Sequence, residues 1–295
     1  MKYKNHIEFY NKDKKLEKKI YELMSEFMKE TKHELCSDMR ILDFIYILSD
    51  FMINYFDLSE KKIGKIVNKV IAHPSRVLQH VYTILRYLET EGYEFNESVK
   101  YDMLIATMLH DIGKFVTEHT EIKDKNHNIV SYLMVKYLLD RDKTLNENDK
   151  NIILQMILMH SHKKENQEVI NLYDKILRDA DLFDEQCGDS LYDFLKSKIQ
   201  NHNMNMNTFY LIEVEPVIDF LKSKKNIKYI NERINIEENR HLFKFEFNRA
   251  MIKFSNYINK PTEVIITDEI KDYFNTNRCL NINIDRKSVG RERVC

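Results

Sequence analysis

The chain has 295 residues, a length for which ordinary domain sizes predict about two domains. It contains only 5 glycines and 3 prolines, well below the average usage of about 7% and about 5%. This scarcity disfavours turn-rich β-sandwiches, β-barrels and glycine-rich nucleotide loops. The 46 basic and 47 acidic side chains give a net charge of -1, so no global field draws the chain to nucleic acid or anionic lipid.

Cysteine usage and hydropathy bear on the compartment. None of the 4 cysteines lies in a C-x-x-C pair or a zinc-like cluster, so we expect reduced thiols in a cytoplasmic protein. Residues 1–13 lack the apolar core of a signal peptide. Residues 41–56 are the most apolar stretch, but Asp43 and Asp50 interrupt it, which favours a buried helix over a membrane span. We therefore expect no membrane partner.

Two amphipathic helices are predicted in the N-terminal part. Over residues 14–32, apolar residues such as Ile20, Leu23 and Phe27 recur at spacings of three and four, with lysine and glutamate between them. A second helix of the same kind is predicted over residues 38–56.

Pro74 marks the start of a central unit, because proline suits the first turn of a helix and disfavours helix in the residue before it. Five helical segments are predicted there, roughly over residues 75–91, 97–110, 127–140, 148–161 and 169–197. The chain is accordingly divided into an N-terminal helical segment (1–73), a central domain (74–198), a mostly helical C-terminal segment (199–284) and a tail (285–295).

The fold class expected from these patterns is mainly all-α, with a small β element near the C-terminus. That element is suggested by apolar alternation in residues 242–247 and 280–284 and by the β-branched run 264–266. Residues 285–295 break from the preceding composition, and two interpretations stay open: translated sequencing-adapter sequence, or an ordinary basic terminus.

Histidine and aspartate residues in the central unit form the pattern that indicates chemistry. The histidines share helix faces with apolar residues at spacings of three and four, as His80 does with Val77 and Ile84. Such side chains, directed inward from separate helices, destabilise a fold unless something neutralises and hydrogen-bonds them. A metal ion does both, and imidazole with carboxylate ligands suits Fe, Mn, Zn, Ni or Co. The residues are His80, His110, Asp111, His127, His160 and Asp181.

The sequence L-H-D-I-G-K at residues 109–114 follows an apolar helix, with His80 upstream and an Ala-Asp dipeptide ending at Asp181 downstream. This order resembles the HD superfamily of metal-dependent phosphohydrolases, and the resemblance covers about residues 74–198. It implies a helical bundle that holds divalent transition-metal ions.

The resemblance also assigns the metal ligands. Asp111 is placed to bridge a first ion to a second, and His127 and His160 match two further histidines of the binuclear branch, so two ions are expected rather than one. Asp179 competes with Asp181 for the last position of the first ion and otherwise supports a ligand. The residues matched to the first ion are His80, His110, Asp111 and Asp181.

Three basic residues are candidates for contact with substrate phosphate. Lys114 follows the ligand pair on a tight turn, and with Asp111 it is our candidate catalytic residue. Arg76 lies one helical turn before His80, where it reaches the same phosphate or pairs with an acidic neighbour. His162 binds substrate, supports a ligand or is exposed. Outside the pattern, and expected to be structural or solvated, are His73, His202 and His241.

The resemblance implies hydrolysis of a phosphoester by a metal-activated water. We expect a phosphomonoesterase or phosphodiesterase that acts on a small phosphorylated substrate, a nucleotide in particular. The Gly-Tyr-Pro sequence of cyclic-di-GMP phosphodiesterases is absent after His160, and Lys114 and Phe115 stand where ppGpp hydrolases have Glu and Asp. The layout looks closer to dinucleoside-tetraphosphate hydrolases and to the HD domain of a membrane-tethered endoribonuclease.

Three alternatives stay open. An HD nuclease acting on RNA or single-stranded DNA shares the motif and needs a basic strand-binding groove. A di-iron HD-fold oxygenase uses almost the same ligands, and the motif alone does not separate hydrolysis from oxygen activation. A non-catalytic ligand-sensing module is the third. The sequence leaves a homo-oligomer open as well.

Overall fold

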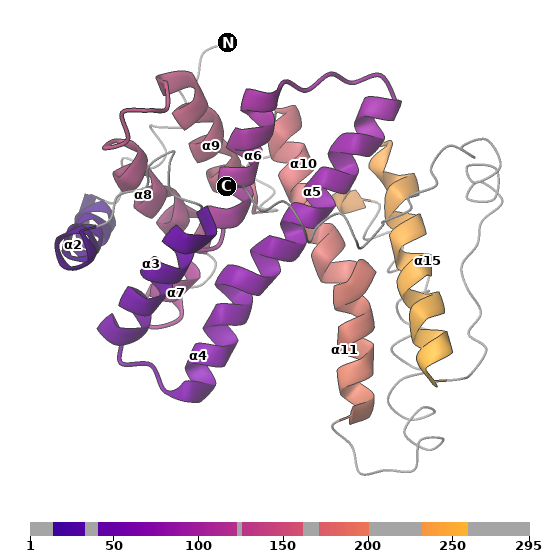
Figure 1. The fold of residues 1–295 in the computed structure, drawn as a ribbon, viewed down its shortest axis with the longest axis horizontal. Coiled ribbons are helices and arrows are strands. Elements are labelled where there is room, and N and C mark those ends of the chain that lie inside the picture. Colours follow the sequence, from indigo (N-terminus) through magenta and orange to yellow (C-terminus); the bar gives the residue numbers. More distant parts are fainter. Residues whose placement is uncertain (1–13, 33–40, 123–125, 162–170, 201–231, 259–295) are drawn as a thin grey trace, which may run out of the picture.

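The computed structural model describes residues 14–32, 41–122, 126–161, 171–200 and 232–258. Every regular element in these ranges is a helix, which confirms the all-α class (Figure 1). None of the described helices is both long and apolar enough to cross a membrane. The helices are α2 (Lys14–Thr31), α3 (Ile41–Tyr55), α4 (Glu60–Val67), η1 (Asn68–Ala72), α5 (His73–Thr90), α6 (Glu97–Leu109), α7 (Lys114–Thr117), α8 (His127–Leu139), α9 (Glu147–Met159), α10 (Leu172–Gln186), α11 (Gly188–Gln200) and α15 (Asn239–Ile258).

The two N-terminal helices form close to where their apolar spacing predicts them. The apolar stripe of α2 is buried, and Phe27 meets Phe44 of α3 edge-on, with ring centroids 5.8 Å apart. Because α2 also packs against α8, this pair of helices covers one side of the central unit.

The helices α4, η1 and α5 follow one another without a break over residues 60–90, and Figure 1 shows them as one long rod across the molecule. The middle turn is π-helical. Pro74 cannot donate to the carbonyl of Val70, four residues back, and its ring would collide with that carbonyl. The wider turn accommodates the proline, and the N–H of His73 donates to Asn68, five residues back. The boundary drawn at residue 73 therefore falls within a continuous helix.

Two central helices bring histidines to the same place. The helices α6 and α9 pack against each other, and asparagine side chains cap the N-terminus of each. Asn96 accepts from a backbone N–H of the first turn of α6, and Asn146 does the same for α9. At their other ends, the residues that follow the two helices are His110 and His160.

The segment 169–197, expected as one helix, is two. Cys187 is extended, with φ -152° and ψ -168°, and Gly188 has a φ of 64°, in the left-handed region that glycine adopts without strain. The chain therefore turns between α10 and α11. Figure 1 shows α11 and α15 side by side, and the two helices are in contact.

The strand expected over residues 242–247 is wrong, because these residues belong to α15. Their apolar alternation is the start of a longer helical spacing, in which Phe243, Phe247, Met251 and Phe254 all face the core. The runs 264–266 and 280–284 and the tail 285–295 lie outside the described residues.

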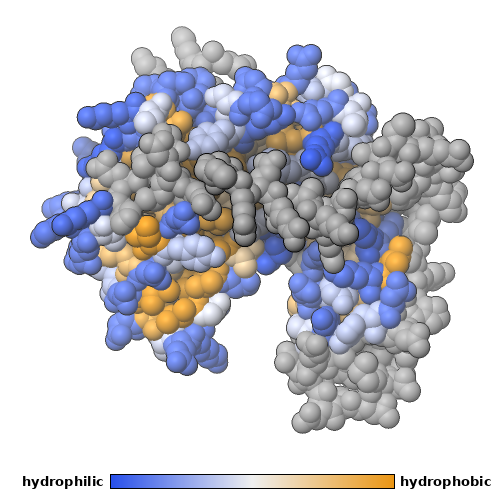
Figure 2. Space-filling view, in the orientation of Figure 1, coloured by the Kyte–Doolittle hydropathy of each residue, from blue (hydrophilic) through white to orange (hydrophobic). Residues whose placement is uncertain are grey.

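One apolar core runs from α2 through the central helices to α15. The division of the chain into three helical segments stays a prediction. On the face shown in Figure 2, apolar residues gather over α3 and α4. Leu42 of α3 is one of the exposed large apolar residues, with an exposed fraction of 43%.

Candidate metal centre

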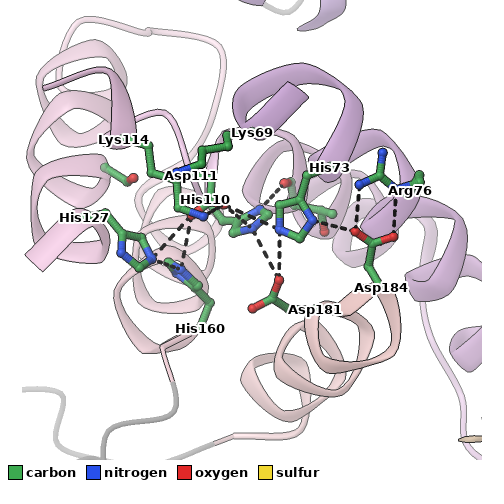
Figure 3. A network of polar contacts seen from close by, with 12 residues as sticks. Lys69, His73, Arg76, His110, Asp111, Lys114, His127, His160, Asp181 and Asp184 are labelled. Carbon is green, nitrogen blue, oxygen red and sulfur yellow. Dashed lines mark hydrogen bonds and ion pairs between the residues drawn. The ribbon is translucent and has the colours of Figure 1, made fainter. Parts of the chain in front are cut away.

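Six histidine and aspartate side chains meet where several helices begin or end (Figure 3). Two directly follow α6 and α9, two are the first residues of α5 and α8, one lies on α10, and one is in the turn after α6. The six residues are His73, His110, Asp111, His127, His160 and Asp181.

Asp111 lies at the middle of the cluster, and its two carboxylate oxygens face different histidines. Oδ2 lies 3.5 Å from Nε2 of His73 and 3.5 Å from Nε2 of His110. Oδ1 lies 3.4 Å from Nε2 of His127 and 3.7 Å from Nε2 of His160. The carboxylate therefore separates two pairs of histidine nitrogens, as a ligand shared between two ions would.

Asp181 completes the group on the Oδ2 side. Its Oδ1 lies 3.0 Å from Nε2 of His73 and 3.9 Å from Nε2 of His110. On the other side, the Nε2 atoms of His127 and His160 are 3.0 Å apart. Two sets of ligand atoms lie close enough together to share an ion: one comes from His73, His110 and Asp181, the other from His110, Asp111 and His160.

Hydrogen bonds fix the histidine rings from behind. Nδ1 of His110 lies 2.6 Å from the carbonyl oxygen of Thr107, and Nδ1 of His160 lies 2.6 Å from that of Ile157. Donation from Nδ1 leaves Nε2 of each ring with its lone pair directed at the cluster. Arg178, which is fully buried, donates to the carbonyl oxygens on both sides of His160 and so holds the end of α9 in place.

The residues present fit a metal site. His110 Nε2 and Asp111 Oδ1 are buried and have no hydrogen-bond partner. Buried polar atoms without partners are rare in folded proteins. All six ligand candidates are imidazole nitrogens or carboxylate oxygens, the donor set that suits divalent transition metals.

Comparison with known families agrees with this geometry. The family model described as HD domain matches residues 70–186. These residues are an HD domain. No curated protein and no solved structure matched the chain. The match contains all six residues of the cluster, together with the helices that carry them.

Electrostatics within the HD domain favour metal binding. Burial raises the pKa of Asp111, but His110 and Lys114 outweigh it, and the pKa of this carboxyl lies well below its usual range. Burial lowers the pKa of His110, and it lowers that of His160 further. At neutral pH the carboxylate is therefore ionised and both rings are neutral, which are the forms that ligate a metal.

His73 differs from these two rings. Burial lowers its pKa, but hydrogen bonds to Asp181 and Asp184 outweigh burial and raise the pKa to about 10. A divalent ion thus competes with a proton for Nε2 of His73, so metal uptake at this nitrogen releases a proton.

The structure places His73, and not His80, in the candidate metal centre of the HD domain. His80 lies against Phe183, with ring centroids 5.9 Å apart, and faces Gly188 at the start of α11. Burial lowers the pKa of His80 to about 4, so its ring is neutral. Sequence reasoning missed His73 because it is seven residues from His80, almost two turns. The two therefore share a helix face but lie about 10 Å apart along the axis.

Three further candidates have definite places in the HD domain. Lys114 pairs with Asp111, so it lies beside the ligands as expected. Arg76 holds Asp184 with two nitrogens, so the acidic-neighbour alternative describes its contact. Asp179 is outside the cluster: it is fully buried and accepts hydrogen bonds from Asn235 and Ile236, before α15, and from Asn239, the first residue of α15. His162 lies outside the described residues.

Gly113 allows the L-H-D-I-G-K turn to lie directly against α8. Its φ is -61°, an ordinary helical value, so glycine is not needed here for its backbone freedom. A Cβ at this position would lie 2.4 Å from the carbonyl oxygen of His127 and 2.5 Å from the nitrogen of Ser131. The N–H of Gly113 also donates to Oγ of Ser131, 2.8 Å away. This close approach brings His127 to Asp111.

Proposed function

We propose that the chain is a metal-dependent phosphohydrolase that hydrolyses a phosphoester, of a nucleotide in particular, with two divalent transition-metal ions at its HD site. The observation that carries the proposal is that the two carboxylate oxygens of Asp111 face different histidines. Oδ2 faces His73 and His110, and Oδ1 faces His127 and His160. Binuclear hydrolytic sites share a ligand in this way.

The ligands proposed for the first ion are His73, His110, Asp111 and Asp181, with His73 in the position that the sequence gave to His80. For the second ion they are Asp111, His127 and His160. When bound, such ions supply a water of lowered pKa and polarise the phosphoryl oxygens. The hydrogen bonds behind His110 and His160 keep both rings turned toward the centre, so little reorganisation is needed.

Lys114 is the residue proposed to bind the substrate phosphate. Its ammonium group pairs with Asp111, and its side chain is 18% exposed, so it lies at the centre and still meets solvent. A lysine there attracts an anionic group and stabilises charge that develops on the phosphoryl oxygens. The contacts of Arg76 do not support binding of the substrate phosphate, because its guanidinium group pairs with Asp184.

The test combines metal analysis with turnover. The chain is loaded with Mn, Ni, Co, Fe or Zn, the bound metal is measured per chain, and hydrolysis is followed with bis-p-nitrophenyl phosphate, nucleoside phosphates and short RNA. We expect up to two ions per chain and turnover of at least one nucleotide. Absence of turnover with every metal would refute the proposal, and oxygen consumption by an iron-loaded chain would favour the oxygenase.

A matched pair of variants tests the choice of ligand. His73→Ala removes a proposed ligand, so we expect it to lose one ion and most hydrolysis. His80→Gln changes a half-buried ring on the same helix face, and we expect it to keep both ions. If His80→Gln loses an ion and His73→Ala keeps both, His80 is the ligand of the first ion instead.

A further inference from the structure

Asp184 lies on α10, one turn after Asp181, and only 3% of its side chain is exposed. Nδ1 of His73 lies 2.6 Å from its Oδ2. Arg76 contacts the same carboxylate through two nitrogens, with Nε 2.9 Å from Oδ1 and Nη2 3.1 Å from Oδ2. Figure 3 shows Asp184 and Arg76 facing each other on the far side of His73 from Asp111.

Two helices build this arrangement from one repeated spacing. His73 and Arg76 are three residues apart on α5, and Asp181 and Asp184 are three residues apart on α10. Because α5 packs against α10, each residue of one pair meets a residue of the other. His73 is held between both aspartates, through Nε2 on one side and Nδ1 on the other.

The support behind His73 differs in charge from that behind its neighbours. His110 and His160 donate from Nδ1 to neutral backbone carbonyls, whereas His73 donates to a carboxylate. A hydrogen bond to an ionised acceptor is about twice as strong as a neutral one. A carboxylate behind an imidazole also fixes the ring and makes its other nitrogen a stronger metal donor.

Arg76 makes the buried carboxylate tolerable. An aspartate as buried as Asp184 destabilises the fold unless a cation compensates its charge. The planar guanidinium group of Arg76 does so through paired contacts, which also fix the orientation of the carboxylate.

We propose that Asp184, oriented by Arg76, is the positioning residue for His73, and that it strengthens binding of the ion on the His73 side and leaves the other ion unaffected. This inference rests on the proposed metal centre but not on the identity of the substrate. Asp184 acts through His73 and makes the two ion positions unequal, whereas the two carbonyl-supported rings are alike.

The experiment measures metal binding directly. Metal-free chain is titrated with Co²⁺ in buffers of defined free concentration, and bound metal and the visible absorption of Co²⁺ are recorded. We expect Asp184→Asn to weaken one of the two binding steps by about 10–100-fold, with a changed absorption spectrum, and to leave the other step unaltered. Arg76→Gln is expected to change the same step in the same direction, but less.

The matched control is Asp140→Asn. Asp140 is 47% exposed and pairs with Lys136 on α8, so the control removes one negative charge from an ion pair outside the metal centre. We expect it to leave both binding steps unchanged. Circular dichroism of each variant verifies the fold, and Arg76→Gln keeps the inference testable if Asp184→Asn does not fold.

The deciding comparison repeats Asp184→Asn in a His73→Ala chain, with Co²⁺ raised until the binding step weakened by the loss of His73 can be measured. Because Asp184 acts through His73, the second change is expected to have no further effect on cobalt binding there. Wild-type binding by both Asp184→Asn and Arg76→Gln, equal weakening of both steps, or an undiminished effect without His73 would each overturn the inference. Two bound ions without phosphoester turnover would instead refute the proposed function alone.

Discussion

The contact between Gly113 and α8 gives a prediction whose size follows from the geometry. In Gly113→Ala the added methyl group would lie 2.4 Å from the His127 carbonyl oxygen and 2.5 Å from the Ser131 nitrogen, each about 1 Å short of ordinary contact. Both obstacles are backbone atoms, so no side-chain rotation relieves them. The turn and α8 must separate by about that distance.

The separation affects stability and the site together. Overpacking of this kind destabilises proteins by about 1–3 kcal/mol, and we expect Gly113→Ala near the upper end because the obstacles are rigid. Nε2 of His127 lies 3.4 Å from Asp111 Oδ1, and a shift of about 1 Å would leave the two atoms too far apart to bind the same ion. The ion on the His127 side should therefore be the one that is lost.

Gly64→Ala is the matched control, since nothing lies within 4 Å of a Cβ at Gly64 in α4. The same substitution there should stabilise the chain by up to about 1 kcal/mol through helix propensity. Urea unfolding followed by circular dichroism, with metal analysis of the native protein, measures both effects. If Gly113→Ala unfolds at the wild-type urea concentration and binds two ions, the reasoning from close approach is wrong.

Two buried aspartates outside the histidine–aspartate cluster, Asp102 and Asp179, give two further predictions. Burial raises the pKa of Asp102 to about 7, and neither carboxylate oxygen has a hydrogen-bond partner, so native stability falls as the pH rises from about 4 through 7. Asp102→Asn should raise the free energy of unfolding by about 1–3 kcal/mol at pH 8 but hardly at pH 4. The exposed Asp193→Asn is the control. An Asp102→Asn gain that is the same at both pH values, or equal to that of the control, would contradict the prediction. Asp179→Ala should lower the free energy of unfolding by about 2–4 kcal/mol, because four hydrogen bonds are lost, three to the segment before α15 and one to its first residue. Metal analysis should still find the wild-type content in that variant, and loss of an ion would return Asp179 to the ligand set.

Sequence periodicity predicted the helices most directly where the apolar spacing is long and regular, as in α2 and α5. It failed at residues 242–247, since a short alternating run is compatible with a strand or with one side of a helix. The longer spacing through Met251 and Phe254 was the signal that separates the two.

The candidate ligand set was predictable where a motif fixes it and ambiguous where only a helix face does. His110 and Asp111 are adjacent in the motif, and the structure brings them together with Asp181. His73 and His80 lie on one face of one helix. Which of them meets Asp111 depends on the position of α5 along its axis relative to the helices packed against it. The pairing of Arg76 with Asp184 joins residues 108 positions apart, which no local pattern contains.

The π-helical turn at η1 has a consequence for insertions and deletions. A π turn holds about one residue more than an α turn, and each residue of a helix rotates the chain by about 100°. Deleting one residue from η1 would rotate α4 by about 100° around the axis of the rod, so that another face of α4 would meet the core, while α5 and His73 stayed in place. Pro74 opposes such a deletion, because a regular α turn would drive its ring into the preceding carbonyl. The number of residues between α4 and His73 is thus fixed by a single proline.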